Sequence, residues 1–283
     1  MYPETSPAAM QHSALAWRAQ GRIVGLVPTM GYWHEGHMSL VRWAREHCDI
    51  LVASIFVNPT QFGPQEDLAS YPHDLDRDAA IAQDLGVDVL FCPSKDQIYG
   101  PDHDTWITVP SVAAHLCGRS RPTHFQGVAT IVCKLFQLTQ PSIAVFGEKD
   151  WQQLALIRAM TRDLNLPVHI EGRPIVREPD GLAMSSRNVY LTPEERAVAP
   201  HIHKGLKLLA EAAYQGLAPA ELIERTTAYY AHHIPTGQLD YLELVDPVRV
   251  QPVTTCAGDV VAAVALRLGK ARLIDNILIS CGN

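Results

Sequence analysis

The feature that most restricts the fold of this chain is a repeated change of hydrophobic pattern in its first 170 residues. Short runs rich in Val, Ile and Leu alternate with longer segments of helical periodicity. Buried parallel strands read as continuous apolar runs, and each parallel pair needs a crossover long enough to hold a helix. The pattern therefore predicts a doubly wound α/β domain with a parallel sheet, whose ligands bind beyond the carboxyl ends of the strands. The expected strands are Ile23–Val27, Ile50–Val57, Val87–Cys92, Ile143–Phe146 and Val168–Glu171, and the expected helices are His37–His47, Leu75–Leu85, Val128–Leu138 and Trp151–Leu164.

A different pattern begins near Ile175. The run Thr192-Pro193-Glu194-Glu195 offers an N-cap, a proline at the first helical position and a capping-box glutamate. It predicts one long helix through about Tyr214. Helices followed by short strands are typical of a separate α+β domain. The chain is thus expected to divide into a nucleotide-binding domain at 1–174 and a smaller α+β lid domain at 175–283. The remaining expected elements are a helix over Ala218–His232 and strands over Tyr241–Val245, Val260–Leu266 and Ala271–Ile279.

Composition excludes several classes of protein. A net charge of −7 argues against a nucleic-acid binder, which usually presents a basic face. The apolar runs are far shorter than a membrane helix needs, and residues 1–20 lack the basic-then-apolar pattern of a signal peptide. Six cysteines are scattered without a C-x-x-C pair, which fits reduced thiols in a cytoplasm rather than a disulfide scaffold or a zinc site.

The stretch 25-GLVPTMGYWHEGHMSLVRWA-44 is the first candidate site. A buried strand ends in a turn, and His34 and His37 stand where a helix begins. A helix N-terminus carries unpaired N–H groups and about half a positive charge, which suits a phosphate. Two imidazoles at the same point add donors. A pair of polar residues at a helix start is the plainer interpretation, but the strand–turn–glycine–helix context favours a function.

Two familiar motifs do not match this stretch. Its histidines are one residue too close for the H-E-x-x-H of zinc proteases, with Gly36 between them. The turn is neither a P-loop nor a G-x-G-x-x-G fingerprint. If it binds a nucleotide, it does so by another design.

Three further stretches place polar side chains at strand ends or at a domain junction. In 54-SIFVNPTQFG-63, Asn58 and Gln61 suit hydrogen bonds to substrate hydroxyl and carboxylate groups, although Asn-Pro alone also explains a turn. In 142-SIAVFGEKDWQQL-154, Lys149 follows a buried strand and can reach an anion. In 174-PIVREPDGLAMSSRNVYLTPEE-195, two serines and Arg187 suit a phosphate, in a loop that could equally be a linker.

Together and in this order, the four stretches resemble the pantothenate synthetase (pantoate–β-alanine ligase) family. Pro28–His37 matches P-T-M-G-x-L-H-x-G-H, and Phe56–Phe62 matches F-V-N-P-x-Q-F. Gly147–Gln153 matches G-E-K-D-x-Q-Q, and Met184–Asn188 matches M-S-S-R-N. The histidine pair alone is shared with many nucleotidylyltransferases, whereas four motifs in register are specific.

The resemblance implies ATP-dependent condensation of (R)-pantoate with β-alanine through a pantoyl adenylate, by a cytoplasmic homodimer that uses Mg²⁺. It also implies a Rossmann-like, nucleotidylyltransferase-type domain similar to that of class I aminoacyl-tRNA synthetases. The implied catalytic residues are His34, His37, Lys149, Ser185, Ser186 and Arg187. The implied ATP contacts are Met30, Gly31, Tyr32, Trp33, His34, Glu35, Gly36, His37, Gly147, Glu148, Lys149, Asp150, Val176, Met184, Ser185, Ser186 and Arg187. Gln61, Gln153 and Asn58 are the implied contacts for pantoate and β-alanine, and no metal ligands are assigned.

The chain departs from the family pattern at two places. Tyr32-Trp33 replace a common Ala-Leu, so the turn must pack larger side chains, and Gln126 stands where Arg is frequent. Two other functions stay open at this point. Another small-molecule nucleotidylyltransferase would use the same histidine pair, but would not need Asn58, Gln61 or the Met184–Asn188 loop. A non-catalytic nucleotide-binding regulator would bind ATP without turnover.

Overall fold

The computed structural model describes residues 1–64 and 66–282, which form two compact units. The first unit comprises residues 1–109, 123–148 and 156–174. The second comprises residues 110–122, 149–155 and 175–283. The second unit thus includes two segments that precede residue 175. A functional division at 174/175 stays a prediction.

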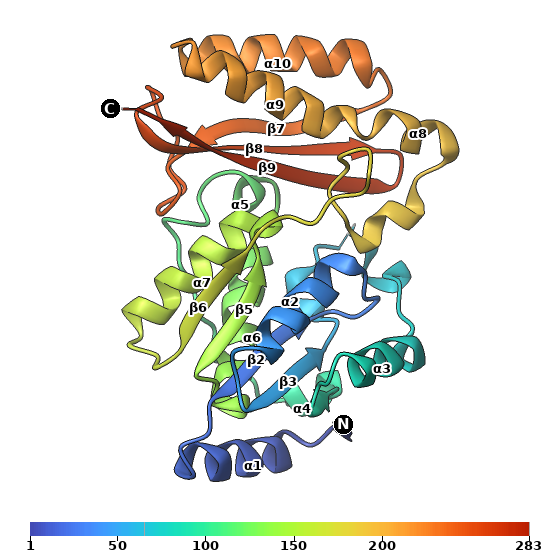
Figure 1. The fold of residues 1–283 in the computed structure, drawn as a ribbon, viewed down its shortest axis with the longest axis vertical. Coiled ribbons are helices and arrows are strands. Elements are labelled where there is room, and N and C mark those ends of the chain that lie inside the picture. The colour runs from blue at the N-terminus through green and yellow to red at the C-terminus, as the bar shows by residue number, and fades with distance from the viewer. Residues whose placement is uncertain (65, 283) are drawn as a thin grey trace. The chain divides into compact units, whose positions relative to one another are not determined.

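The first unit is built on a six-stranded parallel sheet with the strand order β1-β4-β3-β2-β5-β6 (Figure 1). β2 and β3 pair in parallel, with Val24 opposite Ile50, and β5 and β6 pair in parallel, with Gly147 opposite Arg173. The doubly wound α/β prediction is therefore confirmed. The strands are β1 (Tyr2–Glu4), β2 (Val24–Thr29), β3 (Ile50–Ile55), β4 (Val89–Phe91), β5 (Ile143–Gly147) and β6 (His169–Arg173).

Helices cover both faces of this sheet because alternate strand residues point to opposite sides. Val27, Leu51 and Val145 pack in one buried cluster with Leu40 of α2 and Ala82 of α3. On the other face, α6 sets Phe136 edge-on to Phe146 of β5, with ring centroids 6.5 Å apart. The helices are α1 (Pro7–Ala19), α2 (Glu35–Arg45), α3 (Leu75–Asp84), α4 (Lys95–Ile98) and α6 (His124–Thr139), with 3-10 turns η1 (Pro59–Gln61) and η2 (Asp67–Ser70). The turn η3 (Glu148–Asp150) and helix α7 (Trp151–Asp163) are divided between the units, because residues 149–155 belong to the second.

The second unit has a three-stranded antiparallel sheet in the order β7-β8-β9. Leu206 and Leu209 of α9 and Leu222 of α10 pack against Val264 of β8 and Leu273 of β9 in one buried cluster. This is the α+β arrangement predicted for the carboxyl-terminal part. Its elements are α5 (Cys117–Ser120), η4 (Ser186–Tyr190), α8 (Pro193–Val198), α9 (His201–Tyr214), α10 (Pro219–His233), β7 (Gln238–Val245), β8 (Gly258–Leu268) and β9 (Ala271–Cys281).

One predicted helix is wrong in its extent. The expected helix from Thr192 to about Tyr214 is two helices, α8 and α9, interrupted at Ala199 and Pro200. Proline has no N–H for the next intrahelical bond, and its ring collides with the carbonyl four residues earlier. The N-cap prediction holds, since the Thr192 hydroxyl accepts from the Glu195 N–H and the Glu195 carboxylate accepts from the Thr192 N–H.

Candidate active site

Three of the four candidate stretches of sequence follow neighbouring strands of the parallel sheet. β2 lies between β3 and β5, and all three run in the same direction. The chain passes from β2 to β3 and β4 on one side, then returns to β5 and β6 on the other. The switch in direction therefore lies between β2 and β5, and ligands of doubly wound sheets bind beyond the strand ends at such a point. Asn58 and Gln61 follow β3, Met30–His37 follow β2, and Gly147 ends β5.

The helix that follows β2 is capped by two histidines. His34 is the N-cap of α2, and its Nδ1 accepts from the Gly36 N–H at 3.1 Å. The Nδ1 of His37 accepts from the His34 N–H at 3.4 Å. A neutral imidazole whose Nδ1 accepts must carry its proton on Nε2. The caps thus assign both rings as Nε2–H donors, with ring centroids 4.1 Å apart.

Gly36 makes this arrangement sterically feasible. A Cβ at this position would lie 2.8 Å from His34 Cε1 and 2.9 Å from Nδ1. Glu35, between His34 and Gly36, turns its carboxylate to Arg42 further along the same helix, with Nη2 3.2 Å from Oε2. The first turn of α2 therefore presents backbone N–H groups and imidazoles, while its one carboxylate is neutralised.

The turn before α2 is held by a buried carboxylate that the sequence analysis did not identify. Asp78 of α3 is 1% exposed and accepts from the N–H groups of Tyr32 at 2.6 Å and Trp33 at 2.8 Å. Burial raises the pKa of Asp78, and these two hydrogen bonds act in the opposite direction. Gly31 at φ +88° precedes Tyr32, which itself has a φ of +53°. Such a backbone is unfavourable for a tyrosine, and the charge-assisted bond to Asp78 offsets part of that cost.

The same turn accommodates its unusually large side chains. Trp33 is fully buried in the α2–α3 cluster, and its indole N–H donates to Thr29 Oγ1 at 2.9 Å. The Arg77 guanidinium lies over the Tyr32 ring at 5.4 Å and donates to the Trp33 carbonyl at 2.9 Å. Trp33 is therefore packed into the core of the first unit, whereas Tyr32 is half-buried against the Arg77 guanidinium.

The two amides after β3 have different surroundings. Asn58 is 1% exposed, and its Nδ2 donates to Gln61 Oε1 at 3.2 Å and to the Gly127 carbonyl at 3.1 Å. Its Oδ1 accepts from the Thr60 and Tyr99 hydroxyls, each at 3.0 Å. Both ends of the Asn58 amide are thus committed to protein partners. This geometry favours Asn58 as the residue that orients Gln61.

Gln61 connects two candidate stretches. Its Nε2 donates to the Met30 Sδ at 2.9 Å, and its carbonyl lies 2.9 Å from Nδ1 of His124. Gln61 is 9% exposed and stands at the end of the 3-10 turn η1. The structure therefore brings the segments after β2 and β3 together and adds His124 and Tyr99 as supports.

The second unit holds residues 149–155, which follow Glu148. The Lys149 ammonium makes no hydrogen bond or ion pair with any residue in the described ranges 1–64 and 66–282. Asp150 is exposed. Gln152 is buried, and its amide is saturated by the Cys117 N–H at 3.0 Å and the carbonyls of Val112 and His115. Gln153, one residue further, is half-buried, so it is the amide of this pair that stays available to a ligand.

The stretch from Val176 to Asn188 folds into a hairpin and a short 3-10 helix in the second unit. The Val176 carbonyl accepts from the Met184 N–H at 3.0 Å, and Arg177 pairs with Ala183 in an antiparallel β-bridge. Ser185 caps η4, with its hydroxyl 3.3 Å from the Arg187 N–H. Ser186, in the same turn, is 7% exposed. The predicted polar loop thus contains a short 3-10 helix that brings both serines and Arg187 into one turn.

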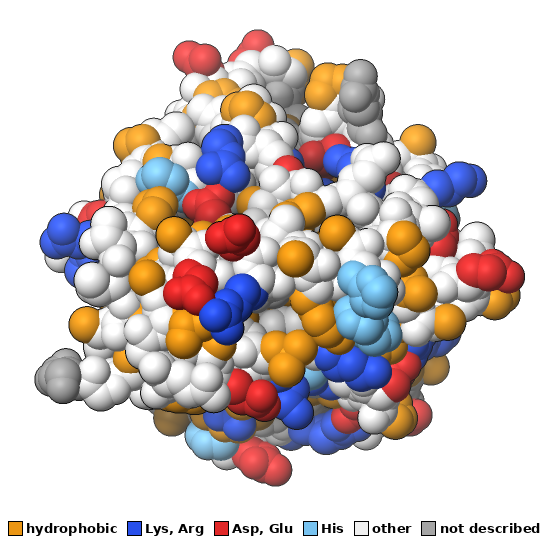
Figure 2. All heavy atoms as spheres, turned by 90° about the horizontal axis from the view of Figure 1, so that it is seen from above, with side chains coloured by type: hydrophobic (Ala, Val, Ile, Leu, Met, Phe, Trp, Pro, Cys, Tyr) orange, Lys and Arg blue, Asp and Glu red, His pale blue; other side chains and the backbone are white. Residues whose placement is uncertain are grey.

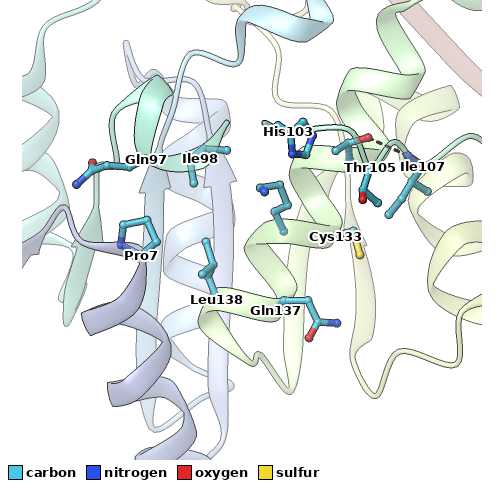
Figure 3. Close-up of a pocket in the computed structure, with 11 residues that line it drawn as sticks. Pro7, Gln97, Ile98, His103, Thr105, Ile107, Cys133, Gln137 and Leu138 are labelled. Carbon is cyan, nitrogen blue, oxygen red and sulfur yellow. Dashed lines mark hydrogen bonds between the residues drawn. The ribbon is translucent and has the colours of Figure 1, made fainter. Parts of the chain in front are cut away.

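A separate cavity of about 370 Å³ lies in the first unit, away from these strand ends (Figure 3). Its lining comes from the start of α1, from α4, from residues 103–107 and from one side of α6. The Ile107 N–H donates to Thr130 Oγ1 at 3.0 Å across it, as the dashed line in the figure shows. None of the candidate site residues lines this cavity.

Several function classes receive no support from the described residues. No cluster of three or more His, Cys, Asp or Glu side chains in residues 1–64 and 66–282 could hold a metal ion. No helix in the same part of the chain is both long and apolar enough to cross a membrane. On the face shown in Figure 2, acidic and basic side chains are interspersed, without the broad basic field of a nucleic-acid binder.

Comparison with known proteins identifies the family. A family model described as pantoate-beta-alanine ligase matches residues 4–278. The pantothenate synthetase of Nitratidesulfovibrio vulgaris strain DP4 is 55% identical over 276 residues, covering 97% of this chain and 98% of its own. That of Maridesulfovibrio salexigens is 53% identical, with the same coverage.

Two solved structures agree with these sequence matches. The crystal structure of pantothenate synthetase from Thermus thermophilus is 44% identical, with a TM-score of 0.91 over 98% of this chain and 99% of its own. The pantoate-beta-alanine ligase of Francisella tularensis, complexed with beta-gamma ATP and beta-alanine, is 35% identical, with a TM-score of 0.80 over 98% and 97%. By fold and by similarity along nearly its whole length, the chain belongs to the pantoate–β-alanine ligase family.

Proposed function

We propose that this chain condenses (R)-pantoate with β-alanine at the expense of ATP, releasing pantothenate, AMP and pyrophosphate. The observation that carries the proposal is the pair of Nε2–H donors at the N-terminus of α2, at the switch point of the sheet, in the stretch whose Met30 contacts Gln61. A carboxylate does not react with an amine at neutral pH without a better leaving group. Attack of the pantoate carboxylate on the α-phosphorus supplies one as an acyl adenylate.

The residues fit the charge that develops in this step. Negative charge accumulates on the phosphates, and donors already aimed there lower the barrier. His34 and His37 offer N–H groups and the helix dipole, while Lys149, Ser185, Ser186 and Arg187 offer a further cationic and hydroxyl set. Because the imidazole Nε2 atoms carry protons, we assign the histidines as donors to phosphate rather than as bases.

The other site residues divide between contacts to ATP and contacts to pantoate and β-alanine. We propose that Met30–His37, Gly147–Asp150, Val176 and Met184–Arg187 contact ATP. Gln61 and Gln153 contact pantoate and β-alanine, and Asn58 acts through Gln61. The support is the position of each segment within its own unit: at a strand end in the first, and in residues 149–155, the 176–184 hairpin or η4 in the second.

Mg²⁺ is part of the proposal as an ion that arrives with the nucleotide. The described residues hold no three-ligand cluster, and Mg²⁺ commonly binds through substrate phosphates while keeping several waters. It would neutralise the pyrophosphate leaving group. A homodimer and a cytoplasmic location are likewise carried over from the family resemblance, and six free thiols suit a reducing compartment.

The direct test supplies ATP, Mg²⁺, pantoate and β-alanine and detects products by mass spectrometry. We expect AMP and pantothenate in equal amounts, with no pantothenate when any one substrate is omitted. ATP binding without turnover would instead support a nucleotide-binding regulator. AMP transfer to another small acceptor in preference to pantoate would support a different nucleotidylyltransferase.

A further inference from the structure

Two adjacent polar residues are buried in β9. Asp275 is 3% exposed and Asn276 is 5% exposed, in a strand whose other buried members are apolar. Neighbours on a strand point to opposite faces of the sheet. A buried carboxylate and a buried amide are costly unless each is fully paired. The hydrogen-bond partners of Asp275 and Asn276 therefore indicate the role of these two residues.

Asp275 binds the 176–184 hairpin, which leads into the turn that carries Ser185, Ser186 and Arg187. Its carboxylate receives both Arg177 Nη atoms, at 2.7 and 2.9 Å. The same guanidinium donates to the Gly181 carbonyl at 3.1 Å, at the tip of the 176–184 hairpin. A bidentate pair fixes direction as well as distance. The segment that carries Met184–Arg187 is thereby fastened to β9 at its base.

Asn276 holds the other cationic segment. Its Nδ2 donates to the Lys149 carbonyl at 2.9 Å. Its own N–H donates to Asp275 Oδ1 at 2.8 Å, and its carbonyl lies 3.5 Å from Arg177 Nη2. The carboxylate, the amide and the guanidinium thus form one connected network within the second unit.

We infer that Asp275 and Asn276 are positioning residues that hold Lys149 and the Met184–Arg187 turn at a fixed spacing on one strand. Neither residue needs to touch the substrate. The inference rests on the proposed function, because it takes both segments to act on the same ATP. Catalysis by fixed donors depends on placement, and a displacement of about 1 Å can cost on the order of 100-fold in rate.

The main test removes the side-chain donor that holds the Lys149 carbonyl. In Asn276→Ala, we expect pantoate-dependent exchange of labelled pyrophosphate into ATP to slow by about 10- to 100-fold. The KM for pantoate should stay within about twofold, because Gln61 lies on η1 and Gln153 on helix α7, and not at the Lys149 carbonyl that Asn276 holds. Asn276→Asp keeps the shape but replaces the donor with an acceptor, so it should show the same loss. If Asn276→Ala does not fold, the exchange rate of Asn276→Asp tests the inference in its place.

The second test compares Arg177→Lys with Arg177→Ala. Lysine keeps the charge and one bond to Asp275 but loses the bidentate geometry, so it should recover part of the exchange rate lost in the alanine variant. Asp240→Asn is the matched control. It breaks the Arg272–Asp240 pair of the same sheet, 2.6 Å long, which contacts neither segment. It should lower the thermal midpoint without changing exchange.

The outcomes separate this inference from the proposed function. If wild-type protein shows no pantoate-dependent exchange and forms no pantothenate, both the proposed function and the inference that rests on it are wrong. If the wild type is active and a folded Asn276→Ala or Asn276→Asp exchanges at the wild-type rate, only the inference is overturned. Equal loss in the Asp240→Asn control would reduce the role of Asn276 to stability, which also overturns it.

Discussion

At the residue scale, His37 has two roles that a substitution can separate. Its Nδ1 accepts from the His34 N–H, and its Nε2–H is assigned to phosphate. Losing one such donor to a developing charge costs roughly 2.7–4 kcal/mol in well-studied enzymes. His37→Ala should therefore lose about 10²–10³ in the kcat of pyrophosphate exchange. The cap bond is long, so the thermal midpoint should change little.

His37→Gln is the informative partner of that variant. Glutamine is a natural capping-box residue at this helix position, and its amide also supplies a donor, so part of the rate should return. His47, exposed at the other end of the same segment, is the control, and His47→Ala should keep wild-type exchange. A folded His37→Ala with wild-type exchange would leave His37 as a helix cap and nothing more.

The sequence predicted the histidines but not what holds them. A strand, a turn and a helix start are local patterns, so His34 and His37 could be placed from spacing alone. Asp78 lies on a different helix from the turn that it fixes, and no periodicity links it to Tyr32 and Trp33. Its role follows from tertiary contact only.

The paired glutamines of α7 show the same limit. Gln152 and Gln153 are neighbours with the same chemistry, and the sequence does not indicate which of the two amides hydrogen-bonds within the protein. In the structure, backbone groups of Val112, His115 and Cys117 saturate Gln152. The family motif nevertheless assigned substrate to Gln153, the half-buried neighbour that backbone groups do not saturate. Asn58 was treated as an equal of Gln61, whereas its four bonds are all internal.

At the element scale, helix α6 packs against the η1 turn at a glycine. A Cβ on Gly127 would lie 2.6 Å from the Thr60 carbonyl oxygen and 2.8 Å from the Gln61 nitrogen. Real Cβ atoms do not approach backbone so closely, so only glycine permits α6 to support this turn. The sequence marks the glycine but gives no sign of this approach, because Thr60 lies more than sixty residues away along the chain.

The start of α9 gives this part of the protein a pH dependence. Burial, followed by the charge of Arg177, lowers the pKa of His203, although Asp275 opposes the shift and Lys207 adds to it. Burial also lowers the pKa of His201. The folded state therefore binds fewer protons than the unfolded state near pH 6. Stability is fully present above about pH 6.5 and falls as the pH drops from there through the lowered pKa values.

Urea unfolding at a series of pH values measures this effect. Wild-type protein should lose free energy of unfolding between pH 7 and pH 5, at a rate of at most about 1.4 kcal/mol per pH unit for each proton taken up. His203→Gln removes one titrating group, so its curve should be flatter over this range. Parallel curves for the two proteins would show that His203 titrates alike in both states.

At the scale of the whole molecule, the two fold classes were predictable and the composition of the units was not. Apolar periodicity identified the parallel sheet and the antiparallel strands, because each face must be buried. It also led to one uninterrupted boundary at 174/175. The second compact unit also takes in residues 110–122 and 149–155, and a functional boundary at 174/175 stays a prediction. Their membership depends on contacts such as Gln152 with Val112, and Asn276 with Lys149, which join distant parts of the chain.

The order of the two chemical steps is a property of the whole chain, since both units contribute residues to the proposed reaction. The capped histidines carry their protons on Nε2, which suits them to stabilise phosphate charge and not to act as nucleophiles. The carboxylate of pantoate must then attack the α-phosphorus directly, and a separate adenylate should form before β-alanine reacts.

Isotope exchange tests this order. With ATP, Mg²⁺ and pantoate alone, labelled pyrophosphate should exchange into ATP, because adenylate formation is reversible without the amine. Omitting pantoate should abolish the exchange, which excludes adenylation of the protein itself. Adding β-alanine should reduce exchange and release AMP, because the amine traps the acyl group. Exchange that begins only when β-alanine is present would mean that the amine takes part in the first step, and the separate adenylate would have to be abandoned.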